Sequence, residues 1–219
     1  DVRLVGSEMC IRDRNSTVVT MGKSTSNIIR AKRMIGGNGG SIGAILTNRI
    51  FDNAGDMTTA GLDFHLHPGS NIHITLHGTA SIHNESDNFE YIYDQSTNDY
   101  PSTFDNGRYT KTFDGEKITG NALGFAINYR DRTDDYGVVL RLRSPGFRTS
   151  NGFEKNNSTK WLKAGRGKTV YFNNHPKLLK TKYNIETVYK TNYSGVIKKQ
   201  ELSLSTSSDF KNGDFFKLS

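Results

Sequence analysis

Five side chains able to bind a metal fall close together in the sequence: Asp63, His65, His67, His73 and His77. The His-x-His spacing places two imidazoles on one face of a strand, and a turn over 68–72 would bring the second pair opposite the first. Several neutral imidazoles held on one rigid surface can ligate zinc, nickel or iron. We favour a polar sheet face in contact with solvent, or histidines that pair across an oligomer, and expect no cofactor. A divalent-metal site on this hairpin is the alternative.

Three carboxylates, Asp131, Asp134 and Asp135, lie within one predicted turn. Oxygen ligands at this density could hold calcium. Aspartate is also an ordinary turn residue, because its side chain accepts hydrogen bonds from nearby backbone N–H groups. We favour the turn role and keep the calcium site as the alternative.

Positive charge is concentrated in one part of the chain. The protein has 29 Lys and Arg against 22 Asp and Glu, for a net charge of +7. Residues 141–199 contain 14 of those cations and only two acids, Glu154 and Glu186. Such a segment creates a field that attracts polyanions, although a solvated face balanced by acids elsewhere is the alternative.

Cations and an aromatic residue that could hold a polyanion or a glycan lie within this segment. These candidates are Arg141, Arg143, Lys160, Trp161, Lys163, Arg166 and Lys168.

The composition excludes several classes of protein. With one Cys, Cys10, the chain cannot have an internal disulfide framework. Strong helix formers are scarce, with eight Ala and seven Glu against 21 Thr, 20 Asn and 19 Ser, which disfavours a helical fold. No run approaches the length of about 18 apolar residues that a membrane-spanning helix needs, so we expect no membrane span.

Alternation of apolar and polar residues predicts the strands that would position the histidines. Leu62, Phe64 and Leu66 share one face, and a turn over 68–72 leads to a returning strand with the same alternation. This register is expected to place Asp63 opposite His77.

A second hairpin is predicted over 123–143, with Tyr129 opposite Tyr136. We expect a long polar loop over 144–168, and further strands over 169–172, 183–192 and 196–205.

The stretch GNALGFAINYRDRTDDYGVVLRLR, residues 120–143, resembles a hairpin common in concanavalin-like and laminin-G-like domains. That resemblance implies a two-sheet sandwich that often binds glycans, sometimes through calcium held by loop acids. No catalytic residue carries over, because the closely spaced Glu pair of related glycoside hydrolases is absent. The expected fold is all-β, an antiparallel two-sheet sandwich of jelly-roll or concanavalin-like type, in a single domain.

Three segments are expected along the chain. Residues 1–14, DVRLVGSEMCIRDR, resemble translated sequencing-adapter read-through and are treated as non-native. Residues 15–60 are rich in glycine and are expected to be irregular or loosely paired. Residues 61–219 are expected to form the sandwich.

These features favour a non-catalytic binding or structural module. We expect a phage or virus particle component, or a surface protein, that contacts nucleic acid or an acidic glycan through 141–199 and associates with itself. A virion or extracellular location is favoured, although the sequence does not fix it. The alternatives are a lectin-like carbohydrate-binding domain and a metal-dependent enzyme that uses the hairpin 63–77.

Overall fold

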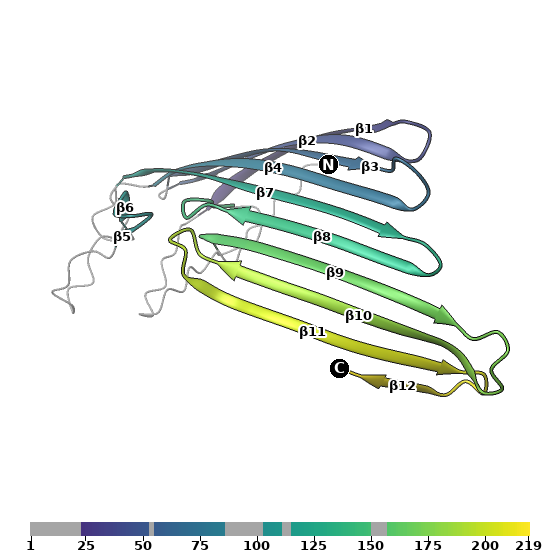
Figure 1. Ribbon diagram of the computed structural model, residues 1–219. Coiled ribbons are helices and arrows are strands. Elements are labelled where there is room, and N and C mark those ends of the chain that lie inside the picture. Colours follow the sequence, from purple (N-terminus) through teal and green to yellow (C-terminus); the bar gives the residue numbers. More distant parts are fainter. Residues whose placement is uncertain (1–22, 53–54, 86–102, 111–114, 150–156) are drawn as a thin grey trace.

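The computed structural model describes residues 23–52, 55–85, 103–110, 115–149 and 157–219, and these residues contain strands and no helix. Ten strands form one antiparallel sheet, in the order β1-β2-β3-β4-β7-β8-β9-β10-β11-β12. Apart from β5 and β6, strands that follow one another in the chain therefore lie side by side, in a curved and twisted sheet (Figure 1). The prediction of an all-β antiparallel fold is confirmed.

The strands of the large sheet are β1 Ser24–Ile35, β2 Gly40–Phe51, β3 Asp56–Leu66, β4 Ile72–Asn84, β7 Lys117–Arg130, β8 Asp134–Arg143, β9 Thr159–Tyr171, β10 Leu178–Thr191, β11 Ile197–Phe210 and β12 Phe215–Leu218. A second, two-stranded sheet pairs β5 Thr103–Phe104 with β6 Tyr109–Thr110. The two sheets of the described residues thus differ greatly in size.

The predicted register of both hairpins is confirmed. Asp63 pairs with His77 across β3 and β4, and Tyr129 pairs with Tyr136 across β7 and β8. Directly paired residues lie on the same face of a sheet, so the pairs of all ten strands assign every strand residue to one of two faces.

Two predictions about irregular segments are wrong. Residues 24–35 and 40–51, inside the segment expected to be irregular, form the regular strands β1 and β2. Their glycines are used in the turn between them, where Gly36 and Gly39 have φ angles of 69° and 78°. The expected loop over 144–168 is also too long, because β9 begins at Thr159.

Other expectations lie outside the described residues. These are the adapter-like residues 1–14 and the Cys at position 10. No helix within the ranges that the structure describes is long and apolar enough to cross a membrane.

The two ends of the sheet have connections of different length. The connections 36–39, 67–71, 131–133, 172–177 and 211–214 are all short and lie at one end, called here the turn end. At the opposite end, called here the loop end, β4 ends and β7 begins, β8 ends and β9 begins, and the short connection 192–196 joins β10 to β11.

A small core lies at the loop end. Its members are Phe51, Met57, Tyr109, Ile118 and Phe147, and Ile118 is only 2% exposed. Phe51, Met57 and Ile118 come from one face of the sheet, while the other two residues come from connections. The connecting segments therefore pack onto that face, and Arg148 N–H donates to Ser81 Oγ over 3.1 Å.

Candidate functional site

The two faces of the large sheet differ in chemistry. One, called here the apolar face, presents large apolar side chains on every strand, among them Ile29, Leu46, Leu62, Leu76, Leu123, Val138, Leu162, Ile185, Leu204 and Leu218. The other, called here the polar face, presents Ser, Thr, His and charged residues. Alternation within each strand and in-register pairing between strands produce this division.

Charged residues are rare on the apolar face. Over β1–β10 they are Arg33, Asp56, Lys117, Asp134, Lys160, Arg166 and Lys168. All of them except Arg166 fall within the first or last four residues of their strands. Arg166 lies opposite Tyr136, the third residue of β8.

A line of paired residues crosses the polar face from β1 to β11 and is called here the transverse row. Its members are Lys32, Gly43, Asp63, His77, Gly124, Arg141, Trp161, Lys190 and Lys199, each opposite the next on the neighbouring strand. The row combines four cations, one carboxylate, one imidazole and one indole on a rigid support.

The β3 end of the row is organised by Asp63. Its Oδ1 accepts a hydrogen bond from Arg30 over 3.2 Å, and its Oδ2 lies 3.7 Å from His65 Nε2. A Cβ on Gly43 would come within 2.6 Å of Asp63 Oδ1, so glycine there leaves room for the carboxylate to lie over the sheet.

His77 lies in the middle of the row and covers Gly124, whose hypothetical Cβ would meet the imidazole at 2.0 Å. Burial lowers the pKa of His77, and the positive charges of Arg141 and Arg143 lower it further against the opposing effect of Asp63. The imidazole is therefore held toward its neutral form beside two guanidinium groups.

The β8–β11 end of the row is cationic. The Arg141 guanidinium lies 4.9 Å from the centre of the Trp161 ring, within the range of a cation–π interaction. Lys190 follows on β10, and Lys199 on β11 forms an ion pair with Glu201. Within the described part of the chain, Arg141 and Lys190 make no ion pair.

Ion pairs line the polar side of β10 at increasing distance from the row, at Glu186, Lys182 and Lys180, which lie four, eight and ten residues before Lys190. Lys163 Nζ lies 2.6 Å from Glu186, and Lys180 Nζ lies 2.9 Å from Asp209. A further lysine, Lys182, lies 3.6 Å from Asp135. Exposed pairs of this kind contribute little to stability, so they leave the charges available to a ligand.

The seven residues predicted to bind a polyanion divide between the two faces. Arg141, Arg143, Trp161 and Lys163 lie on the polar face, while Lys160, Arg166 and Lys168 lie on the apolar face. They therefore cannot contact one ligand together. Sequence reasoning missed Lys180, Lys182, Lys190 and Lys199, which join the polar-face group; alternation along β10 and β11 was the signal that could have found them.

The predicted metal ligands fall into two groups. Asp63 and His77 belong to the row, and His65 lies beside Asp63 on β3. His67 and His73 meet edge to face at the turn end, with ring centres 4.6 Å apart. His67 Nδ1 is also 2.9 Å from the carbonyl oxygen of Asn38. Among the residues that the structure describes, no three His, Cys, Asp or Glu side chains are grouped so that they could hold a metal ion.

The three turn aspartates have separate partners. Asp131 accepts hydrogen bonds from the backbone N–H of Asp134 at 2.6 Å and of Thr133 at 2.7 Å, which lowers the pKa of Asp131 to about 2. Asp134 pairs with Lys168 on the apolar face, and Asp135 pairs with Arg130 on the polar face. The carboxylates therefore act as turn and ion-pair residues and do not converge as calcium ligands.

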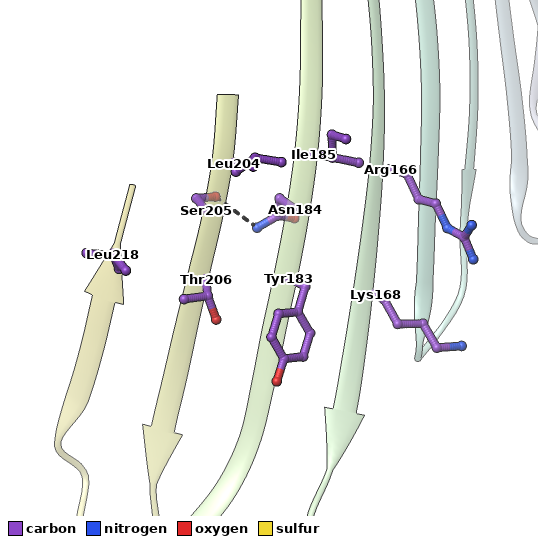
Figure 2. A pocket seen from close by; sticks show the side chains of 9 residues that line it. All are labelled: Arg166, Lys168, Tyr183, Asn184, Ile185, Leu204, Ser205, Thr206 and Leu218. Carbon is purple, nitrogen blue, oxygen red and sulfur yellow. Dashed lines mark hydrogen bonds between the residues drawn. The ribbon is translucent and has the colours of Figure 1, made fainter. Parts of the chain in front are cut away.

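A shallow groove of about 460 Å³ lies over β9–β12. Figure 2 shows that its aliphatic residues, Ile185, Leu204 and Leu218, lie across three strands, with Arg166 and Lys168 along one side. Tyr183 lies between them, with its hydroxyl directed toward the same end as Lys168 (Figure 2). The groove combines an apolar floor with a cationic rim.

No protein-family model, curated protein or solved structure matches this chain. The resemblance of residues 120–143 to concanavalin-like and laminin-G-like domains therefore stays a prediction, although those residues do form the hairpin β7–β8.

Proposed function

We propose that the protein is a non-catalytic surface module that binds an acidic glycan on its polar face, along the β8–β11 part of the transverse row. The observation that carries this proposal is an excess of positive charge on that part of the face. Within four residues of the row, its five cations are Arg141, Arg143, Lys163, Lys190 and Lys199, and its two acids are Glu186 and Glu201.

The arrangement suits a sugar bearing carboxylate or sulfate groups. Arg141 and Lys190 flank Trp161 in the row, so an anionic group on each side of a sugar ring would meet a cation. Hydroxyl groups lie close by, with Ser203 Oγ donating to Glu201 over 3.0 Å. A mixture of cations and neutral hydrogen-bonding groups matches a ligand that carries both charges and hydroxyls.

A nucleic acid is the weaker alternative. The phosphate backbone is best matched by a continuous stripe of cations, because affinity comes from neutralising many phosphates. On this face acids alternate with the lysines, as Glu186 does beside Lys163. This alternation of acids and lysines favours a ligand whose negative charges are farther apart than the phosphates of a nucleic acid.

The test compares two pairs of cations by isothermal titration with a heparin oligosaccharide. Arg141→Gln with Lys190→Gln removes two charges from the row and is expected to weaken binding by about tenfold or more, because each hydrogen bond to a charged group contributes roughly 1.5–3 kcal/mol. The slope of log affinity against log salt should also fall by about one for each ligand-binding cation that is removed.

Lys160→Gln with Lys168→Gln is the matched control, since it removes the same charge from the apolar face. This variant is expected to keep wild-type affinity for heparin. Equal losses in the two variants, or no heparin binding by the wild type at low salt, would contradict the proposal. Tighter binding to duplex DNA than to heparin would instead support the nucleic-acid alternative.

A further inference from the structure

Among the residues that the structure describes, large apolar side chains of the apolar face are exposed across the width of the sheet. Ile29 on β1 is 66% exposed, Leu62 on β3 is 53% exposed and Leu204 on β11 is 63% exposed. The described connecting segments pack on the opposite face, where Phe147 and Arg148 contact β7 and β4. A continuous apolar surface of this size marks a contact with another apolar medium or partner.

The dimensions of this surface match those of a lipid bilayer. Strands β1–β4 and β7–β11 are 10 to 14 residues long. A tilted strand needs about 9–11 residues to cross the hydrocarbon of a membrane. On β2, β4 and β10 the apolar face carries no charged residue at all.

We propose that the apolar face lies against the acyl chains of a lipid bilayer, so that the long strands cross the membrane and the polar face borders water. This replaces the expectation of no membrane span, which considered helices alone. The charged residues of the apolar face then lie at the two headgroup levels, Asp56, Lys117, Lys160 and Lys198 at the loop end and Arg33, Asp134 and Lys168 at the turn end, with Arg166 deeper. Long basic side chains reach headgroups from slightly deeper positions.

The groove over β9–β12 supports contact with an anionic lipid. Its floor of Ile185, Leu204 and Leu218 suits an acyl chain, while Arg166 and Lys168 lie where a phosphate would sit (Figure 2). Arg166 also lies 5.2 Å from the Tyr136 ring, which holds the guanidinium at the edge of the apolar band.

Tyrosines at the turn end favour lipid over a second copy of the chain. Tyr129 donates a hydrogen bond to Asp131 over 2.8 Å, and Tyr136 donates to Asp134 over 3.2 Å. Aromatic residues with a polar tip are enriched where a membrane meets water. A dry interface between two sheets gives no reason for tyrosines and cations to gather at one level.

The proposal has a consequence for the two edge strands. Within hydrocarbon every backbone N–H and C=O must be hydrogen-bonded, because no water is present to replace the partner. The outward backbone groups of β1, of β12 and of residues 197–205 of β11, which β12 does not pair with, must therefore be paired when the sheet is in a membrane, with each other or with further strands.

The single tryptophan allows a direct test. Trp161 is on the polar face and its neighbour Leu162 is on the apolar face. The full chain and the variant W161F/L162W would be reconstituted into phosphatidylcholine–phosphatidylglycerol vesicles whose acyl chains carry bromine, which quenches nearby indoles. Bromolipid is expected to quench the variant at least several-fold more strongly than the wild type, and aqueous acrylamide should show the reverse order.

Two results would overturn the proposal: equal quenching of the two proteins by bromolipid, or a water-soluble dimer in which the indole of the variant is shielded without lipid. Circular dichroism would verify that each protein is folded. If W161F/L162W does not fold, W161F/I185W serves as the second variant, because Ile185 lies on the apolar face of the neighbouring strand β10.

The lipid headgroup is tested separately. Arg166→Gln with Lys168→Gln is expected to reduce binding to phosphatidylglycerol-containing vesicles several-fold and to leave binding to pure phosphatidylcholine vesicles unchanged. Lys180→Gln with Lys182→Gln, on the polar face, is the matched control. Equal reductions in both pairs would refute the assignment of Arg166 and Lys168 to the headgroup level. Heparin binding by the wild type in detergent reports on the proposed function, so the two proposals can fail independently.

Discussion

Strand β4 shows how differently the two faces of the sheet are built. On its polar face Ser81 is 2% exposed, and both ring nitrogens of His83 are shielded from solvent. On its apolar face Leu76 is 38% exposed. In a water-soluble protein the apolar residues are usually the enclosed ones, so β4 has the reverse arrangement.

The same contrast extends to the neighbouring strands. The polar face holds the core of Phe51, Met57 and Ile118 under the connecting segments, together with the transverse row. Over the described part of the chain, no connecting segment covers the apolar face in this way, and its charged residues other than Arg166 lie near the strand ends. Alternation of apolar and polar residues thus separates the side chains of the sheet into two surfaces. The connecting segments and the surroundings of the protein determine which surface is enclosed.

A charge placed on each face of β7 should have the largest effect on this contrast. Leu123 and Asn128 are both exposed on β7, Leu123 on the apolar face and Asn128 on the polar face. Leu123→Arg is expected to lower the free energy of unfolding from vesicles by about 2–4 kcal/mol, the cost of a cation near the centre of a bilayer. Asn128→Arg should change it by less than about 1 kcal/mol.

Urea unfolding in lipid vesicles, followed by the fluorescence of Trp161, would measure both variants. Equal destabilisation would mean that the two faces meet similar surroundings, contrary to the proposal of lipid contact.

Acid should weaken the polar face at the loop end. Burial, assisted by the charge of Arg148, lowers the pKa of His83 from 6.5 to about 4. Between these values the unfolded chain binds more protons than the folded one, so stability falls as the pH decreases from about 6.5 to 4. The difference corresponds to at most roughly 3 kcal/mol.

The measurement is the free energy of unfolding at several pH values from 7.5 to 4. His83→Asn should flatten the profile over this window, whereas His73→Asn, at an exposed position of the same strand, should keep the wild-type slope. If the stability of His83→Asn depended on pH as steeply as that of the wild type, another group would be responsible for the loss of stability in acid.

Sequence patterns predicted the hairpins because their signals are local. Alternation over 62–66 and 123–129, together with polar turns, determined the pairs Asp63–His77 and Tyr129–Tyr136. The same alternation did not reveal that the apolar side is exposed, since the period of two distinguishes the sides of a strand without saying what each side meets.

Strand β9 was missed for a physical reason. Lys160, Arg166 and Lys168 occupy positions on its apolar face, and glycines interrupt its polar face. Gly167 is needed because a Cβ there would come within 2.9 Å of Asn184 Oδ1 on the next strand. Such requirements depend on a neighbouring strand, so the sequence of β9 alone could not show them. Because this strand was not predicted, the division of the candidate polyanion-binding residues between the two faces was not predicted either.

Glycine substitutions should have the smallest effect on stability. They compare the two faces by side-chain packing alone. On the polar face, a Cβ on Gly120 would lie 2.2 Å from the backbone nitrogen of Phe147, so the segment 144–149 would have to move. Gly120→Ala is therefore expected to lower the free energy of unfolding by about 1–3 kcal/mol. On the apolar face, a Cβ on Gly78 would meet nothing within 4 Å. Gly78→Ala should be neutral or stabilise by up to about 1 kcal/mol, because alanine loses less backbone entropy in a strand. Urea unfolding of the two variants would measure the difference, and equal values would argue that Phe147 does not pack against β7.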